Sequence, residues 1–339
     1  MKALAIEQPG EARIVEIAVP EPGPGEVAID PAFVGYCGSD LTSYRGLNPL
    51  VSYPRVPGHE IAGTVSALGQ GVAGLAVGDV VTVLPYFNCG HCRACRAGRP
   101  NACVNNQTMG VQREGAMTSR IVVPAEKVLA VPGLALRDVA LVEPCAVGFH
   151  AARRAEVQAG ETVVVLGCGM IGLGAMMGCL RRGAQVIAVD LSPGKLDVAR
   201  RLGATHALES DADLAKRIEE LVPGGPDVVI EAVGAVSTFL AAVDLVGQCG
   251  RVVYIGYAKD AVAFDTKRFI TKEIDIRGSR NALRSDFNDV VTWLRDNPEA
   301  GGHIVSATVP LEEAPGKLAE WDARPGDFTK ILVSLEPAA

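Results

Sequence analysis

Four cysteines of the chain stand close together, at Cys89, Cys92, Cys95 and Cys103. The two-residue gaps between the first three let successive thiolates turn toward one small ion, and the longer excursion to Cys103 brings a fourth ligand that completes a tetrahedron. Four sulfur ligands would leave no open position on the metal. The spacing therefore predicts a closed, structural zinc site, with His91 facing solvent because it would be a fifth ligand.

A glycine-rich run at residues 167–172 has the sequence Gly-Cys-Gly-Met-Ile-Gly and directly follows the strand-like run 162–166. In that setting the first glycine makes a tight turn, the second lets the backbone approach a pyrophosphate, and the third lets helix and strand pack closely. The helix N-terminus would face the phosphates with its positive end. The run predicts a dinucleotide-binding loop formed by Gly167, Gly169, Met170, Ile171 and Gly172.

Asp190 ends the next expected strand of this part of the chain. A carboxylate there accepts hydrogen bonds from both ribose hydroxyls and repels a 2′-phosphate, so it favours NAD over NADP. The alternative is an aspartate that only caps the following helix. The residues expected to line the adenine and nicotinamide pockets end later strands: Ala232, Val233, Gly234, Gly256 and Tyr257.

The character of the chain changes near residue 161. Before it, short β-like runs alternate with turns rich in glycine and proline, as in an irregular all-β body. After it, apolar strand-length runs alternate with amphipathic helix-length segments, which indicates a parallel sheet covered on both faces. The C-terminal part should pack back on the first domain, since it has no phosphate-binding loop of its own. The expected strands are 80–83, 120–123, 162–167, 185–190, 226–231, 251–256, 273–277 and 330–333, and the expected C-terminal helices are 286–295 and 311–321.

Cys37, His59, Glu60 and Glu143 lie beside turn-forming glycine or proline in the first part of the chain. Each alone is weak evidence for a metal site, because a single cysteine or histidine is more often packed in a core than bound to a metal. The short motifs around them carry more information than the residues themselves.

These motifs are Cys37-Gly-Ser-Asp, Gly58-His-Glu, the four-cysteine segment and Gly-x-Gly-x-x-Gly. Their order and distances resemble those of the medium-chain, zinc-dependent alcohol dehydrogenase superfamily, and within it the polyol (sorbitol-like) and sugar-acid dehydrogenase branch. The resemblance covers essentially the whole chain. It implies an α/β architecture with a GroES-like, β-rich catalytic domain at 1–148, completed by 283–339, and a Rossmann NAD-binding domain with a doubly wound parallel sheet at 149–282.

The resemblance also implies a second, catalytic zinc ion. Cys37 and His59 would bind it, Glu60 would swing in as an exchangeable ligand, and Glu143 would take the place where many alcohol dehydrogenases have a second cysteine. Cys145, two residues later, is the rival for that place. Three protein ligands and a water make an open site, as a Lewis-acid catalyst requires.

Ser39, two residues after Cys37, matches the family's relay hydroxyl, which would carry away the proton of the alcohol. Five residues after the ligand cysteine the family often has a histidine, whereas this chain has Thr42, with Tyr44 nearby. Threonine cannot hold a proton as imidazole can, so the group that would accept the proton from Ser39 is not assigned. In the cofactor domain the resemblance adds Lys195, which would reach the adenosine ribose unless it is a plain surface lysine.

Arg280 and Asn281 lie where polyol dehydrogenases place an arginine that binds substrate hydroxyls, and the register is open by one residue. A guanidinium grips a carboxylate with two parallel hydrogen bonds, so Arg280 would suit a sugar acid as well as a polyol; otherwise it pairs with a neighbouring acid. We therefore expect NAD-linked oxidation of a secondary alcohol on a polyol or aldonate. The alternatives are a simple alcohol, butanediol or threonine dehydrogenase, and a scaffold that binds cofactor without catalysis.

Composition limits the partners and the location. The chain is 48% hydrophobic and 21% charged, and its net charge of −7 offers no basic surface for a nucleic acid. Its apolar runs are too short to span a bilayer, and its first residues do not build a signal peptide, so we expect a cytoplasmic protein. Four of the nine cysteines fall within fifteen residues, and in that reducing compartment such clustering favours metal over disulfides. A homodimer or homotetramer is implied by the resemblance alone.

Overall fold

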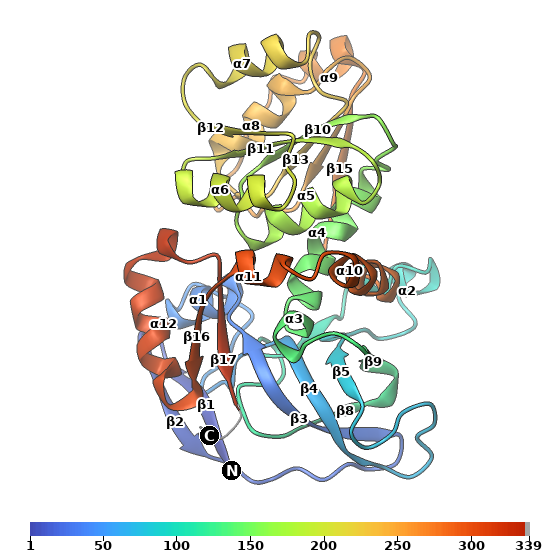
Figure 1. The fold of residues 1–339 in the computed structure, drawn as a ribbon, viewed down its shortest axis with the longest axis vertical. Helices are drawn as coiled ribbons and strands as arrows, with labels where there is room; N and C mark the ends of the chain where they lie inside the picture. Colours follow the sequence, from blue (N-terminus) through green and yellow to red (C-terminus); the bar gives the residue numbers. More distant parts are fainter. Residues whose placement is uncertain (336–339) are drawn as a thin grey trace. The chain divides into compact units, whose positions relative to one another are not determined.

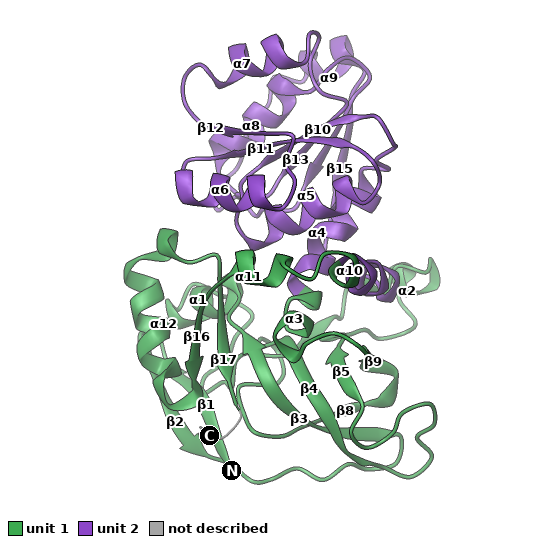
Figure 2. Cartoon of the chain, in the orientation of Figure 1, with its two compact units in different colours: residues 1–143, 294–339 green, residues 144–293 purple. Residues whose placement is uncertain are grey.

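The computed structural model describes residues 1–335, and the chain divides into two compact units. Unit 1 comprises Met1–Glu143 and the segment from Leu294 onward, and unit 2 comprises Pro144–Trp293 (Figure 2). The domain limits expected at residues 148 and 283 differ from these. Helix α4 (Val142–Arg154) runs across the first observed boundary, and helix α10 (Arg284–Asp296) runs across the second. Within residues 1–335, no helix is long and apolar enough to cross a membrane.

Unit 1 is built on a mainly antiparallel sheet whose described strands lie in the order β16-β17-β3-β4-β5-β9, with β8 paired to β3 (Figure 1). A hairpin of β1 and β2 and a short pair of β6 and β7 complete its β structure. The strands are β1 (Lys2–Gln8), β2 (Glu11–Glu16), β3 (Glu26–Gly35), β4 (Glu60–Leu68), β5 (Val80–Val83), β6 (Tyr86–Phe87), β7 (Gln107–Thr108), β8 (Ile121–Pro124), β9 (Val128–Ala130), β16 (Val305–Pro310) and β17 (Lys330–Ser334). The helices are α1 (Gly38–Tyr44), α2 (Arg93–Arg96), α3 (Leu136–Val139), α11 (Ala300–Ile304) and α12 (Ala314–Ala323).

The core of unit 1 joins the hairpin, the sheet and the C-terminal segment. Leu4, Ile29 and Ile61 are completely buried in it, and Leu318 and Val333 from the end of the chain pack into the same cluster. Burying such side chains contributes about 1.5–3 kcal/mol each. The expected return of the C-terminal part to the first domain is therefore seen for β16, α12 and β17.

Register in this sheet brings three chain segments to one place. The last residue of β3, Gly35, pairs with the first residue of β4, Glu60, and with Leu332 of β17. Cys37 lies two residues after the end of β3, His59 directly precedes β4, and Lys330 begins β17. Residues far apart in the sequence thus meet at one edge of the sheet.

Unit 2 contains a parallel sheet, with six strands in the described residues, in the order β12-β11-β10-β13-β14-β15. Counted along the chain this is 3-2-1-4-5-6, the Rossmann order, which reverses between β10 and β13 and places ligands there. The strands are β10 (Thr162–Leu166), β11 (Gln185–Asp190), β12 (His206–Glu209), β13 (Val228–Glu231), β14 (Arg251–Tyr254) and β15 (Asp275–Gly278). The helices are α5 (Met170–Leu180), α6 (Pro193–Arg201), α7 (Leu214–Leu221), α8 (Val236–Leu245) and α9 (Lys267–Lys272).

The α/β fold class is confirmed, and each of the five strands expected in this part of the chain is present. The short strand β12 was not expected, because its ends, His206 and Glu209, are exposed and polar and break the apolar run. The expected helix 286–295 is α10, but most of it belongs to unit 2 rather than to the first domain.

A buried carboxylate explains the place of α10. Asp286 Oδ2 accepts a hydrogen bond from His150 Nδ1 at 2.9 Å, and Asp286 Oδ1 accepts one from Arg153 Nε at 2.6 Å. Both donors lie on α4, so the start of α10 is fastened to a helix of unit 2. Burial alone would raise the pKa of Asp286, but the hydrogen bonds from His150 and Arg153 outweigh it and hold this pKa below 3.8.

We predict that Asp286→Asn lowers the free energy of unfolding by about 2 kcal/mol, because hydrogen bonds to a buried charge are lost. A carboxylate whose pKa is depressed by folding stabilises the fold above its unfolded pKa, near pH 4, and this stabilisation is lost as the pH falls. Urea unfolding of both proteins should therefore show a gap at pH 7 that closes below about pH 4. Asp289→Asn, which removes a half-exposed partner of Arg153, is the control and should cost less than about 1 kcal/mol. An equal gap at all pH values would contradict the charge-based account.

Candidate metal centres and cofactor site

The four cysteines of the 89–103 segment meet around one point in unit 1. Their sulfur atoms form a group of possible metal ligands. The Sγ–Sγ distances are 3.5 Å for Cys92 and Cys95, 3.8 Å for Cys92 and Cys103, and 3.5 Å for Cys103 and Cys89. Four sulfurs at about 2.3 Å from a central zinc ion stand about 3.8 Å apart, so the set fits a tetrahedral zinc site.

Backbone and side-chain donors hold these sulfurs in place. The Cys89 amide donates to Cys103 Sγ at 3.3 Å, and Asn88 Nδ2 donates to Cys95 Sγ at 3.8 Å. The backbone amide of His91 lowers the pKa of Cys89 to about 6, which favours the thiolate that a metal needs. The His91 ring is exposed and faces the Cys89 carbonyl oxygen, so it lies where the sequence placed it.

A second group of ligand atoms forms where β3 ends and β4 begins. One atom each of Cys37, His59 and Glu60 lies within 4.8 Å of the other two, and His59 and Glu60 are buried. Two glycines allow this approach. Gly58 has a φ of +99°, which permits the turn before His59, and a Cβ on Gly35 would stand 2.0 Å from Glu60 Oε2.

Asp40 ties the two ligand-bearing loops together. Its Oδ2 accepts from the Cys37 amide at 2.9 Å and its Oδ1 accepts from the Gly58 amide at 3.4 Å. Asp40 is buried, so these hydrogen bonds fix the distance between the two loops.

Glu143 lies near this group without belonging to it. It stands in the first turn of α4, is buried, and accepts a hydrogen bond at Oε1 from the hydroxyl of Tyr86. Burial raises the pKa of Tyr86 well above its usual value, and the Glu143 charge raises it further, so the phenol keeps its proton. The rival residue Cys145 is also absent from both ligand groups found among residues 1–335.

Lys330 is a partner that sequence reasoning missed. Its Nζ donates to Glu60 Oε1 at 2.6 Å and to the Tyr36 carbonyl oxygen at 2.9 Å, and both side chains of the ion pair are buried. The only signal in the sequence is a lysine at the start of the otherwise apolar run Lys330–Val333. Its contact with Glu60 spans most of the chain and leaves no local pattern.

Burial and neighbouring charges shift the pKa values of the acidic groups around Cys37 and of His59. Burial raises the pKa of Glu60 to about 7 although Lys330 opposes the shift, and burial raises the pKa of Glu143 and of Asp40. Burial alone would lower the pKa of His59, but the charges of Cys37, Asp40 and Glu143 raise it well above 6.5. His59 Nδ1 is buried and has no hydrogen-bond partner within residues 1–335. Sulfur, imidazole and carboxylate gathered within 4.8 Å of one another are ligand types that fit a zinc ion.

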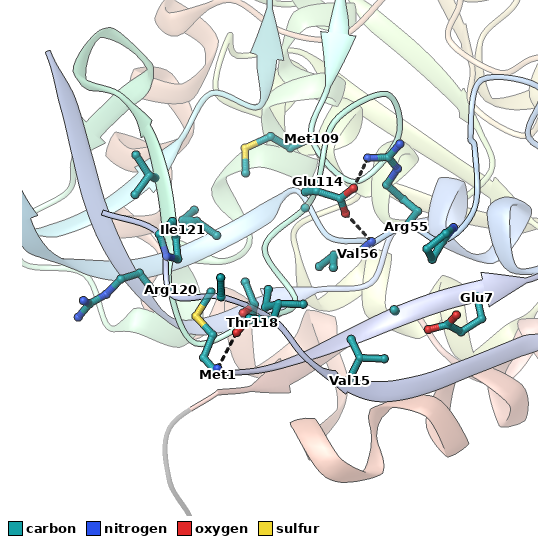
Figure 3. A pocket seen from close by; sticks show the side chains of 17 residues that line it. Met1, Glu7, Val15, Arg55, Val56, Met109, Glu114, Thr118, Arg120 and Ile121 are labelled. Atoms are coloured by element: carbon teal, nitrogen blue, oxygen red, sulfur yellow. Dashed lines mark hydrogen bonds and ion pairs between the residues drawn. The ribbon is translucent and has the colours of Figure 1, made fainter. Parts of the chain in front are cut away.

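Figure 3 shows a different hollow in unit 1, of about 520 Å³, lined by apolar side chains such as Val15, Val56 and Ile121. None of the expected ligands is among its lining residues in the described chain. At its wall Glu114 accepts from Arg55 Nη1 at 2.6 Å and from the Val56 amide at 2.8 Å. This contact steadies the segment just before His59.

The glycine-rich loop of unit 2 has the shape that the sequence predicts. Gly167 has a φ of +97°, and a Cβ on Gly172 would stand 1.8 Å from the Gly167 carbonyl oxygen. A Cβ on Gly169 would meet nothing within 4 Å, so open space lies beside the start of α5, where a phosphate would approach. Met170 and Ile171 begin that helix, whose first amides have no partner within it.

Asp190 stands beside this loop at the end of β11. Its Oδ2 accepts from the Cys168 amide at 2.7 Å and its Oδ1 from the Ser192 amide at 2.9 Å. Each oxygen keeps a lone pair for a ribose hydroxyl. Burial raises the pKa of Cys168 to about 12, so this thiol is packing rather than a nucleophile.

The remaining cofactor residues lie on neighbouring loops of the same sheet. A Cβ on Gly234 would stand 2.9 Å from the Tyr257 carbonyl oxygen, so the loops after β13 and β14 touch. Val233 and Tyr257 are exposed, and Lys195 is half-buried on α6. The loop residues brought together in this way are Ala232, Val233, Gly234, Gly256 and Tyr257.

Two family models match the chain: the alcohol dehydrogenase GroES-like domain over residues 23–133 and the zinc-binding dehydrogenase over residues 171–296. An L-galactonate-5-dehydrogenase from Escherichia coli K12 is 37% identical over 86% of both chains. A sorbitol dehydrogenase from Halalkalibacterium halodurans is 32% identical over 98% of this chain and 99% of its own. A crystal structure of an alcohol dehydrogenase from E. coli CFT073 with the cofactor NADH has a TM-score of 0.92, 28% identity and 99% coverage of both chains.

The chain belongs to the medium-chain, zinc-dependent alcohol dehydrogenase superfamily. As a member of this superfamily it is an oxidoreductase that acts on CH–OH donors with zinc and a nicotinamide cofactor. The GroES-like and Rossmann folds expected from its sequence are confirmed.

The expected proton relay concerns three residues: Ser39, Thr42 and Tyr44. Ser39 Oγ is buried and has no hydrogen-bond partner in the described part of the chain, so it is free to exchange a proton. Thr42 Oγ1 donates to the Gly38 carbonyl oxygen at 2.8 Å, which commits its proton to helix α1. Tyr44 is buried.

The two expected substrate residues lie after β15 in unit 2. Arg280 is exposed, and Asn281 is half-buried with a φ of 51°, the left-handed region. A left-handed asparagine is common in turns that aim side chains. Their role in binding substrate stays a prediction.

We predict that Cys103→Ser and Cys37→Ser separate the two metal centres. Cys103→Ser should lower the melting temperature by several degrees and release one zinc ion, because a closed sulfur site holds a loop together. Cys37→Ser should keep the melting temperature and abolish turnover. Metal analysis, thermal melting and NADH absorbance measure these outcomes. A Cys103→Ser protein with normal melting and no activity would show that the division into two roles is wrong.

Proposed function

We propose that this dehydrogenase transfers a hydride between a secondary alcohol of a polyol or sugar acid and NAD. The observation that carries the proposal is the buried group of Cys37, His59 and Glu60 with Glu143 beside it. Three protein ligands leave a fourth position of a tetrahedral zinc ion for substrate, whereas the four cysteines of the 89–103 segment would fill all four positions. The similarity to L-galactonate and sorbitol dehydrogenases over most of the chain supports the substrate class.

Cys37, His59 and Glu143 would hold the catalytic ion, with Glu60 as an exchangeable ligand. When bound, a zinc ion supplies Lewis-acid chemistry that lowers the pKa of an alcohol. The Ser39 hydroxyl, which has no hydrogen-bond partner in the described part of the chain, would receive the alcohol's proton while it passes its own proton on to solvent water. Lys330 holds Glu60 by an ion pair, and Asp40 fixes the two ligand loops.

The glycine-rich loop, Asp190 and Lys195 would bind different parts of the NAD cofactor. The loop of Gly167, Gly169 and Gly172 would receive the pyrophosphate, with the N-terminus of α5 adding its positive end. Asp190 would accept hydrogen bonds from the ribose hydroxyls and repel a 2′-phosphate, which supports NAD rather than NADP. Lys195 would support the adenosine ribose.

Arg280 or Asn281 would bind the substrate. A guanidinium pairs with a carboxylate through two parallel hydrogen bonds and also donates to hydroxyls. The homodimer or homotetramer and the cytoplasmic location expected from the sequence stay predictions.

A substrate panel tests the proposed function. Purified protein with NAD is offered sorbitol, related polyols and aldonates, with ethanol, 2,3-butanediol and threonine as rivals, and NADH formation is followed. At least one polyol or aldonate should give a kcat/KM at least about tenfold above every rival, a difference of about 1.4 kcal/mol in transition-state binding. A preference for butanediol or threonine would contradict the substrate class and leave the dehydrogenase chemistry intact.

We predict that Asp190→Asn shifts the NAD to NADP ratio of kcat/KM by about tenfold toward NADP. Asparagine keeps an acceptor for the loop amide but removes the charge that repels a 2′-phosphate. Kinetics with both cofactors measure the ratio. An unchanged ratio would mean that Asp190 only supports the loop.

We predict that Arg280→Ala lowers kcat/KM for aldonates at least about tenfold more than for polyols, since only aldonates lose a charge-assisted pair. Arg284→Ala, another exposed arginine four residues away, is the matched control and should treat both classes alike. Equal losses for aldonates and polyols in Arg280→Ala would remove the carboxylate-binding role.

A further inference from the structure

Two buried carboxylates, Glu60 and Glu143, lie near Cys37 and His59; Glu60 is grouped with these two residues, and Glu143 stands beside the group. The two carboxylates have different hydrogen-bond partners. Both oxygens of Glu60 accept from the ammonium group of Lys330. One oxygen of Glu143 accepts from the phenol of Tyr86.

The two partners leave different charges behind. An ammonium group neutralises the carboxylate it binds, so Glu60 has less electrostatic need of a metal ion. A phenol is neutral and orients a carboxylate without cancelling its charge. Tyr86 thus fixes one oxygen of Glu143 without placing a positive charge on it.

Tyr86 is itself held firmly. It is buried, and its strand β6 pairs with β7, Tyr86 to Thr108 and Phe87 to Gln107. Three residues later comes Cys89, the first ligand of the four-cysteine site. The hydroxyl of Tyr86 thus reaches Glu143 from a strand whose continuation is anchored by that site.

We propose that Tyr86 is a positioning residue that fixes one oxygen of Glu143, presents the other to the catalytic metal, and so selects Glu143 over Glu60 as the lasting ligand. The inference rests on the proposed function, because it takes Cys37 and His59 as ligands of that metal. Hydrogen bonds to ligating side chains orient them, and their loss typically costs about 10–100-fold in metal affinity or activity. A tyrosine that only packed would act through its ring alone.

The test is the rate at which zinc passes to a chromogenic chelator. Native protein should release its two zinc ions in two phases, and Cys37→Ser, which lacks the catalytic site, identifies the phase of that site. Tyr86→Phe keeps the ring and removes the hydroxyl. It should speed the catalytic phase at least about tenfold, leave the other phase unchanged and keep the native melting temperature.

The matched control is Tyr254→Phe, which removes a hydroxyl that donates to the Phe239 carbonyl oxygen in unit 2. It should leave both phases unchanged. If Tyr86→Phe also leaves both phases unchanged, Tyr86 has no positioning role and the inference is overturned. If the native protein holds no zinc beyond the four-cysteine site, the proposed function fails instead, and the two failures are thereby distinguished.

A second variant tests the selection between the carboxylates. Glu60→Gln should hardly change the catalytic phase in the native background, where Glu143 is the lasting ligand. In the Tyr86→Phe background it should speed that phase about tenfold further, because Glu60 there replaces a loosened Glu143. An equal effect of Glu60→Gln in both backgrounds would overturn the selection.

Discussion

Unit 1 buries more acidic than basic side chains around Cys37 and His59, and the structure of the candidate metal site is arranged around this excess of acidic groups. Within the described chain its buried carboxyl groups are Asp40, Glu60 and Glu143, and its buried ammonium group is Lys330. Cys37 adds a thiol, and the pKa of His59 is raised by these charges. Lys330 balances the charge of only one of these carboxyl groups, and burying charge that is not balanced costs several kcal/mol, so a metal ion at this place would stabilise the cluster. A divalent ion on a thiolate, an imidazole and a carboxylate supplies the missing charge and the Lewis acid of an alcohol dehydrogenase in one step.

Regular secondary structure and hydrogen bonds hold these charged groups close together. The proposed ligands lie next to the ends of β3 and β4 and in the first turn of α4 rather than on long loops, and Asp40 joins two of these segments. Gly35 and Gly58 provide room where a side chain would collide with Glu60 or Val34. The four-cysteine site performs no such chemistry, since four sulfurs close it. It holds the segment from which Tyr86 reaches Glu143.

Local spacing predicted the parts of the site that are local. The cysteines at 89–103 and the glycines at 167–172 follow patterns set by metal and phosphate geometry, and the structure has them in those shapes. Five of the six strands described in the Rossmann sheet followed from their apolar runs, and β12 did not. Tyr86 and Lys330 escaped prediction, because a hydrogen bond to Glu143 and an ion pair to Glu60 join distant segments and leave no periodic signal. The same cause hid the attachment of α10 to unit 2, which depends on Asp286 meeting His150.

We expect the chain to carry two zinc sites of different kinds, one closed and one open. Anomalous X-ray diffraction at the zinc absorption edge distinguishes them. It should show two peaks per chain, one surrounded by the sulfurs of Cys89, Cys92, Cys95 and Cys103, the other by Cys37, His59 and one carboxylate with a position left to solvent. A single peak, or a second ion enclosed by four protein ligands, would contradict this expectation.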